Sequence, residues 1–156
     1  MAWRIGEMLV QKKLITWEQL EQALEEQKKT KEFTGEVLVR LGFISQTLLY
    51  KTLAEQYKLR FVDLKRVKVN PKAIELIPRS VAHKYSIIPI EARQDVLLIG
   101  ISNPLNVWPE LELKQLTKIA DIRTVLCLPS DIRQAIEEYY GSEEAAVEKV
   151  LKPKSE

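Results

Sequence analysis

The sequence predicts an α+β fold in which a helical N-terminal part, made of two repeated helical hairpins, packs on a small C-terminal α/β part. Two observations predict this fold. A 24-residue block occurs twice near the start of the chain, and the spacing of the apolar residues changes after about residue 58. Repetition at a fixed period is typical of a duplicated supersecondary unit, and alternating strand and helix patterns are typical of an α/β unit.

The duplicated block comprises residues 4–27 and 33–56, which align without a gap when one copy is shifted by 29 positions. Nine of the 24 aligned pairs are identical, where chance would give about one or two. The identical pairs are mostly apolar residues and glycines, so the two copies are expected to share a backbone shape and a buried face.

Each copy is expected to form a short helix, a turn and a second helix. In the first copy, Thr16 is the expected N-cap of the second helix, and Gln19 completes a capping box. In the second copy, Ser45 is the expected cap, and Gly42 is expected to end the short helix in the left-handed conformation. Trp17 is expected to pack between the hairpins.

The rest of the chain alternates between strand and helix patterns. The expected strands are 60–64, 87–90, 96–101 and 122–128, and the expected helices are 70–85, divided at Pro78, then 111–119, and 131–140 between a Ser130 cap and Gly141. We therefore expect a helical tandem-repeat subdomain over 1–58, an α/β subdomain over 59–141, and a tail or linker over 142–156.

The composition is that of a soluble globular protein, with 156 residues, 46% of them hydrophobic and 29% charged. A net charge of +2 gives no electrostatic case for binding nucleic acid. The single cysteine excludes an internal disulfide, and no apolar stretch approaches the roughly 18 residues that would cross a bilayer. A cytoplasmic location without direct membrane insertion is therefore expected.

The motifs of common catalytic sites are missing from the sequence. None of the five glycines begins the GxxxxGK[ST] run of a phosphate-binding loop. The only histidine is His83 and the only cysteine is Cys127, so neither a metal-ligand spacing nor a nucleophile–base pair is present. We therefore predict no catalytic residue and no metal site, and expect that this chain is not an enzyme.

The tandem block and four later segments together resemble the N-terminal domain of type II secretion and type IV pilus assembly ATPases, known as the GspE N-terminal or MshEN-type domain. The later segments are FVDL at 61–64, Pro89, SNPLN at 102–106 and DIRQAIEEYYG at 131–141. The resemblance implies a non-catalytic regulatory and docking domain that binds the cytoplasmic part of an inner-membrane assembly protein. It also implies an ATPase core as a further partner, and a location peripheral to the inner membrane through these partners.

In one branch of that family the tandem motif binds cyclic di-GMP, which is the alternative function here, with no other cofactor required. Glycines would let the backbone approach the ligand, aliphatic residues would pack on its rings, and an arginine would stack on guanine or pair with phosphate. The residues that the resemblance implies as ligand contacts are Arg4, Gly6, Leu9, Val10, Leu14, Ile15, Gln27, Gly35, Leu38, Val39, Gly42, Phe43, Ile44 and Gln56.

The tandem motif is degenerate in this chain. Ile5 stands where leucine is usual, Lys13 stands where the second glycine is expected, and Phe33 and Thr34 replace an Arg-Leu pair. Half of the polar clamp is therefore missing, although Lys13 could still reach a phosphate. Two interpretations stay open: a retained fold without the ligand, and weakened cyclic di-GMP binding.

A third interpretation is a pair of DNA-binding helix-turn-helix units. It is disfavoured because the second helix of the first copy carries Glu18, Glu21, Glu25 and Glu26, which would repel phosphate. We therefore expect no nucleic-acid partner.

Overall fold

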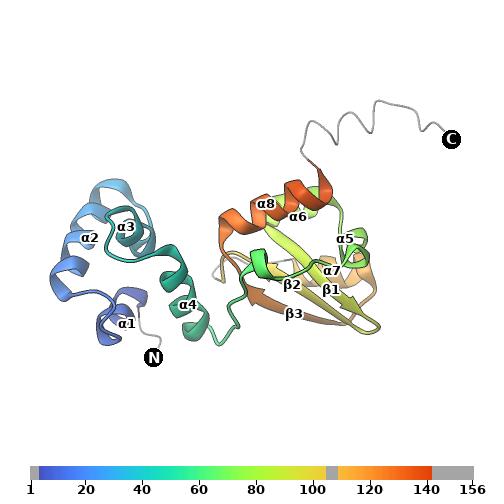
Figure 1. Cartoon of the computed structure of the whole chain (residues 1–156), viewed down its shortest axis with the longest axis horizontal. Coiled ribbons are helices and arrows are strands. Elements are labelled where there is room, and N and C mark those ends of the chain that lie inside the picture. Colours follow the sequence, from blue (N-terminus) through green and yellow to red (C-terminus); the bar gives the residue numbers. More distant parts are fainter. Residues whose placement is uncertain (1–3, 105–108, 142–156) are drawn as a thin grey trace. The chain divides into compact units, whose positions relative to one another are not determined.

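The chain forms two compact units, Met1–Phe61 and Val62–Glu156, in a computed structural model that describes residues 4–104 and 109–141 (Figure 1). The first unit is helical, and the second combines helices with a three-stranded sheet. The expected α+β class is therefore confirmed. The expected tail, 142–156, lies outside the described residues.

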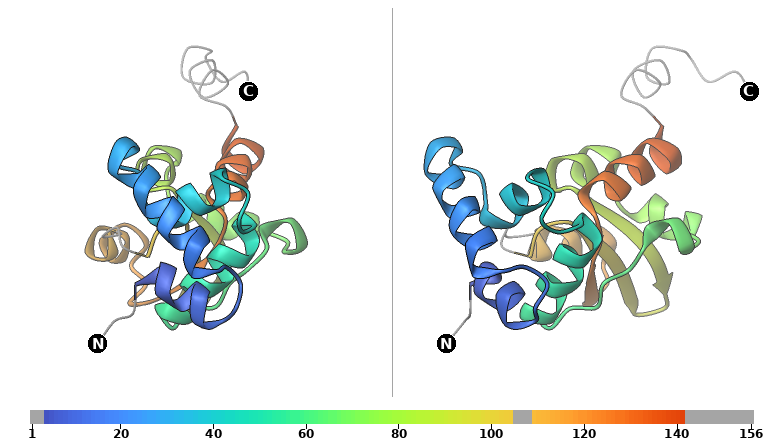
Figure 2. Two further views of the ribbon diagram at one scale, coloured as in Figure 1. Left: turned by 90° about the vertical axis from the view of Figure 1, so that its left-hand side faces the viewer. Right: turned by 60° about the vertical axis from the view of Figure 1, so that its left-hand side comes forward.

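Over residues 4–61, the N-terminal unit forms four helices, which Figure 2 shows from two further directions. They are α1 (Ile5–Gln11), α2 (Trp17–Thr30), α3 (Thr34–Arg40) and α4 (Gln46–Gln56). Within each copy the short helix contacts the long helix that follows it. Each short helix also packs against the long helix of the other copy, and α1 contacts α3. This exchange of partners is the contact pattern of an approximate two-fold arrangement.

Equivalent backbone positions in the two copies have nearly the same conformation. Arg4, before α1, has φ −67° and ψ 145°, and Phe33, before α3, has φ −68° and ψ 144°. The expected caps are confirmed, because Thr16 Oγ1 accepts from Gln19 N at 3.1 Å and Ser45 Oγ accepts from Leu48 N at 3.1 Å. The capping box of the first copy is complete.

Two glycines explain how each short helix approaches its long partner. A Cβ atom on Gly6 would lie 2.5 Å from Leu20 Cδ1, and one on Gly35 would lie 2.8 Å from Leu49 Cδ1. Both glycines are buried at the second position of a seven-residue helix. The repeat is therefore a repeat of packing as well as of sequence.

The C-terminal unit is built on the strands β1 (Ile87–Arg93), β2 (Val96–Ile101) and β3 (Asp121–Leu126). The sheet order is β1-β2-β3. β1 pairs antiparallel with β2, and β2 pairs parallel with β3. The helix α7 (Glu110–Thr117) lies between β2 and β3 in the sequence. The helices α5 (Pro71–Leu76), α6 (Arg79–Tyr85) and α8 (Pro129–Tyr140) contact β1, and Figure 1 shows α6 beside α8.

The core of this unit comes from both strands and helices. Leu97 and Ile99 are fully buried in β2, and Ile132 is fully buried in α8. The predicted division of the first helical segment at Pro78 is confirmed, because α5 ends before it and α6 begins after it. Gly141, at φ 84°, follows the last helix as expected.

Three local predictions were wrong. Residues 60–64 form a single bridge at Phe61 rather than a strand, because Asp63 caps the 3-10 helix η1 (Leu64–Arg66), its carboxylate accepting from Lys65 N at 3.0 Å. The last helix begins at Pro129, a residue favoured in the first helical turn, so Ser130 lies inside it. Trp17 is 57% exposed rather than packed between the hairpins.

None of the helices in the described ranges is long and apolar enough to cross a lipid bilayer.

Candidate ligand-binding site

The residues expected to contact a ligand divide into a buried set and a surface set. The buried set packs the helices together and consists of Gly6, Leu9, Ile15, Gly35, Leu38 and Ile44. The surface set is half-exposed and consists of Val10, Leu14, Val39 and Phe43. In each copy, one member of each adjacent apolar pair therefore faces the core, and the other is available at the surface.

The half-exposed residues surround the turn that ends each short helix. In the first copy, Lys13 N donates to the carbonyl of Val10 at 2.9 Å, and Leu14 N donates to the carbonyl of Leu9 at 3.0 Å. The equivalent bonds of the second copy start from Gly42 N, at 3.0 Å, and Phe43 N, at 2.9 Å. The two turns are therefore the same structure with different side chains.

Lys13 has the same left-handed conformation as Gly42, the residue aligned with it in the second copy. Its φ is 62°, and that of Gly42 is 81°. A Cβ atom on Gly42 would meet nothing within 4 Å, so this position has room for a side chain. Lys31 and Lys118 also end helices at φ near 60°, where a cation is favoured by the partial negative charge of the helix C-terminus.

The cations of the N-terminal unit differ in whether they are paired. Lys12 pairs with Glu55, and Arg40 Nη2 lies 2.9 Å from Glu32 Oε1. The hydrogen bond to Glu32 raises the pKa of Arg40. Among the described residues, no ion pair joins Arg4 or Lys13 to a carboxylate, and both are exposed. These two cations are therefore available to an anionic ligand.

The two glutamines of the motif lie at the ends of the long helices and are half-buried. Gln27 Oε1 accepts a hydrogen bond from Thr34 Oγ1 at 3.0 Å. Thr34 is one of the departures from the expected motif, and this bond ties the end of α2 to the start of α3. Sequence reasoning missed the pair, because no pattern marks a contact between the two copies.

No arrangement suited to a metal was found: within 4–104 and 109–141, no three His, Cys, Asp or Glu residues are grouped to hold an ion. Cys127 is fully buried, and this burial raises the pKa of its thiol to about 12. A thiol of this kind stays protonated and unreactive at neutral pH. Among the described residues, the charged and half-exposed side chains of the tandem repeat are therefore the best candidate for binding.

The model of the MshEN domain family matches residues 57–146. The chain belongs to the MshEN domain family. It is 35% identical over 151 residues to the type IV pilus assembly ATPase PilB of Myxococcus xanthus, a match that covers 97% of this chain and 26% of PilB. This MshEN chain therefore spans about a quarter of the length of that relative.

Two solved structures have the same fold. The structure of MshE with cdg (cyclic di-GMP) is 31% identical, with a TM-score of 0.78, over 88% of this chain and 99% of that one. The N-terminal domain of XpsE is 21% identical, with a TM-score of 0.64, over 88% and 94% of the two chains, and supports the fold alone. The resemblance to these N-terminal domains is confirmed.

The match to MshE extends well beyond the residues of the family model. It leaves 12% of the 156 residues uncovered, or about 19 residues; this is fewer than one 24-residue copy of the repeat. Neither copy can therefore be wholly outside the match.

Proposed function

We propose that this MshEN domain is a non-catalytic docking and regulatory domain of a type II secretion or type IV pilus assembly ATPase. The observation that carries the proposal is its membership of the MshEN family together with its likeness to PilB over nearly its whole length. The proposed setting is the cytoplasm, at the inner membrane. There the domain would bind the cytoplasmic part of an inner-membrane assembly protein and act on an attached or separate ATPase core.

Binding of the full chain to that purified cytoplasmic part, measured by calorimetry, tests the docking proposal. Each unit has an exposed apolar residue at which docking can be tested. Trp17 of the N-terminal unit is 57% exposed, and Leu111 of the C-terminal unit is 71% exposed. If one unit docks, Trp17→Glu or Leu111→Glu will weaken binding while the other leaves it unchanged. An absence of binding by the wild-type chain, with and without an ATPase core and nucleotide, would refute docking.

We also propose that the tandem repeat binds cyclic di-GMP. The supporting observations are the likeness to MshE with cdg and the availability of Arg4 and Lys13, which no described carboxylate neutralises. The half-exposed apolar residues beside the helix-ending turns would pack on the ligand's rings. This binding would regulate the docking activity and needs no further cofactor.

Calorimetric titration with cyclic di-GMP tests this second proposal, and linear GMP serves as the control ligand. Saturable heat with cyclic di-GMP, reduced in Arg4→Ala, is the expected result. No heat at tens of micromolar ligand would remove this function and leave the docking proposal intact.

A further inference from the structure

The sheet of the C-terminal unit has two edges, and they differ in what lies beside them (Figure 1). At one edge, β1 contacts α5, and the carbonyl of Ile90 accepts from Asn70 N at 2.9 Å. At the other edge, β3 pairs with β2 alone. An unpaired strand edge presents N–H and C=O groups that can pair with a strand of another chain. In the part of the chain that the structure describes, β3 is therefore the open edge.

Two hydrogen bonds show which backbone groups of β3 point outward. Cys127 N donates to the carbonyl of Ile101, in β2, at 2.8 Å, whereas the carbonyl of Leu126 accepts from Val62 N at 2.9 Å on the other side. Because backbone groups alternate in direction along a strand, those of Ile122 and Thr124 also point away from β2. Within the described ranges these groups have no backbone partner. The open edge therefore covers 121–125 and is closed at its end by Val62.

The side chains along this edge form a short pattern of acid, apolar residue and base. Asp121 and Arg123 are exposed on the same face, and Arg123 Nη2 lies 3.1 Å from Asp121 Oδ2. Ile122, on the other face, is half-exposed although it is level with the fully buried Leu97 of β2. The apolar side chain is therefore covered on the side of β2 and uncovered on the open side.

The pattern is complementary to itself when a second copy of the strand runs antiparallel. With Ile122 opposite Ile122 of the second copy, outward backbone groups face each other, and Asp121 of each copy lies opposite Arg123 of the other. A shift of the second strand by two residues puts Arg123 opposite Arg123 in one direction, and Asp121 opposite Asp121 in the other. Like charges directly opposite each other are destabilising, so the charges select the register centred on Ile122.

We propose that β3 pairs antiparallel with β3 of a second copy of this chain around Ile122, which joins two three-stranded sheets into one of six strands. The two Ile122 side chains cover each other across the two-fold axis, and four alternating charges lie on the opposite face. This interface belongs to the C-terminal unit and rests on neither function proposed above. Because the paired segment is short, the dimer is weak and depends on protein concentration.

Sedimentation velocity of the full chain, at concentrations up to the millimolar range, measures this association. Asp121→Arg and Arg123→Asp are each expected to weaken it by about tenfold, because two-fold symmetry turns two attractive pairs into repulsive ones. The double variant with both substitutions restores the complementary pattern and is expected to dimerise like the wild type. An equimolar mixture of the two single variants is expected to form a heterodimer, since each then supplies the charges that the other lacks.

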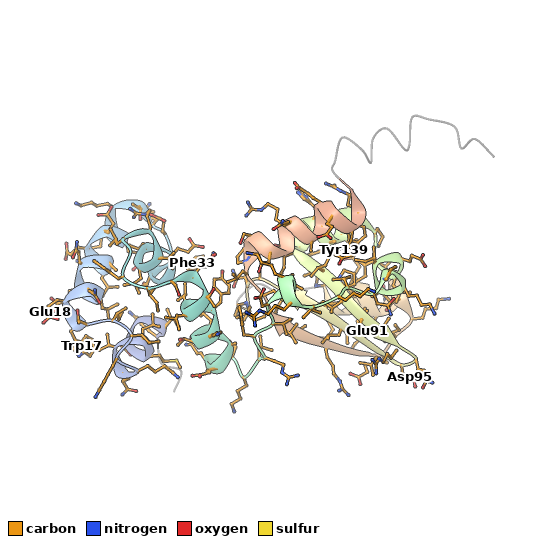
Figure 3. All side chains as sticks on the ribbon, in the orientation of Figure 1. Trp17, Glu18, Phe33, Glu91, Asp95 and Tyr139 are labelled. Atoms are coloured by element: carbon orange, nitrogen blue, oxygen red, sulfur yellow. The ribbon has the colours of Figure 1, made fainter. Side chains whose placement is uncertain are left out.

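Ile122→Pro tests the backbone contact, because it removes an outward N–H and leaves the groups that face β2 in place. It is expected to abolish dimerisation, with circular dichroism showing that the chain is folded. Glu138→Arg is the matched control for Asp121→Arg, since it makes the same charge change at an exposed residue of α8. Figure 3 labels the neighbouring Tyr139 on α8, away from β3.

Amide hydrogen exchange tests the register. The amides of Ile122 and Thr124 are expected to exchange more slowly at concentrations where the dimer forms, whereas that of Arg123, which faces β2, is expected to stay unchanged.

Three results would overturn the proposal. The first is a wild-type chain that stays monomeric at every concentration; if Ile122→Pro then weakened docking to the inner-membrane protein, the edge would belong to a strand of that partner. The second is a dimer that persists in Ile122→Pro, which would place the interface elsewhere. The third is a double variant that associates no better than the single ones, which would refute the self-complementary register.

Discussion

Gly6, in α1, allows a prediction about stability. The effect of Gly6→Ala on the free energy of unfolding should change sign when the contacting residue Leu20 is also replaced. In Gly6→Ala, the new methyl group would lie 2.5 Å from Leu20 Cδ1, and Leu20 is only 4% exposed, so it cannot swing into solvent. Overpacking of this kind costs about 1–3 kcal/mol. Alanine regains about 0.5–1 kcal/mol of helix stability. We therefore expect a net loss of up to about 2.5 kcal/mol in the free energy of unfolding.

The double-mutant cycle isolates that contact. Leu20→Val removes the Cδ atoms that would clash, so Gly6→Ala in this background is expected to stabilise the protein by about 0.5–1 kcal/mol. The coupling energy between the two positions is then about 1–3 kcal/mol, in the range for residues in direct contact. For a chain of 156 residues, a change of 1 kcal/mol in the free energy of unfolding shifts the midpoint of thermal unfolding, Tm, by about 2–4 °C.

Urea denaturation followed by circular dichroism measures the four proteins of the cycle. The midpoint is expected to move while the slope stays constant, because the substitutions change stability rather than the surface exposed on unfolding. Gly35→Ala with Leu49→Val is the equivalent cycle in the second copy, where the clash distance is 2.8 Å. If Gly6→Ala has the same effect with and without Leu20→Val, the packing explanation of the glycine is refuted.

The remaining predictions concern single sites. Thr16→Ala should cost about 1 kcal/mol in an unfolding experiment, because the cap of α2 is lost, and Thr16→Ser should restore it. Gly42→Ala should cost about 1–2 kcal/mol by the same measurement, entirely through its φ of 81°, since its Cβ would meet nothing; a neutral result would contradict this. A thiol reagent at pH 8 should label Cys127 only after urea unfolding, because burial raises the pKa of its thiol to about 12; above the ordinary thiol pKa the unfolded chain loses its proton first, so stability should fall as pH rises. Tyr140→Phe should lower the unfolding free energy by about 1 kcal/mol, because the hydroxyl donates to the carbonyl of Ile77 at 2.8 Å; an unchanged midpoint would show that water replaces this bond.

The helical repeat was predictable because its signals are local. A cap such as Thr16 and a left-handed glycine such as Gly42 determine where helices begin and end within a few residues. The alignment of the copies also pairs Lys13 with Gly42, and the structure shows that the two residues share a left-handed backbone. The strand expected at 60–64 failed for the opposite reason: strand pattern alone did not reveal that the Asp63 carboxylate would cap a 3-10 turn there.

The candidate site was less predictable than the fold, because exposure depends on how the four helices meet. Leu9 and Val10 are adjacent and similar, yet Leu9 is fully buried and Val10 is half-exposed. An aromatic residue also gives no reliable sign of its own, since Trp17 was expected in the core and is 57% exposed. The hydrogen bond between Thr34 and Gln27 depends on the contact of α2 with α3 and has no sequence signal.

The repeat separates what folding requires from what it leaves open. At the identical pair Gly6 and Gly35, the same close contact with a leucine recurs, so packing explains the residue type in both copies. At Arg4 and Phe33 the backbone conformation is the same, and both side chains are exposed. Neither side chain makes a capping hydrogen bond, so neither packing nor capping explains the residue type. The two positions can therefore differ in sequence without a cost in packing.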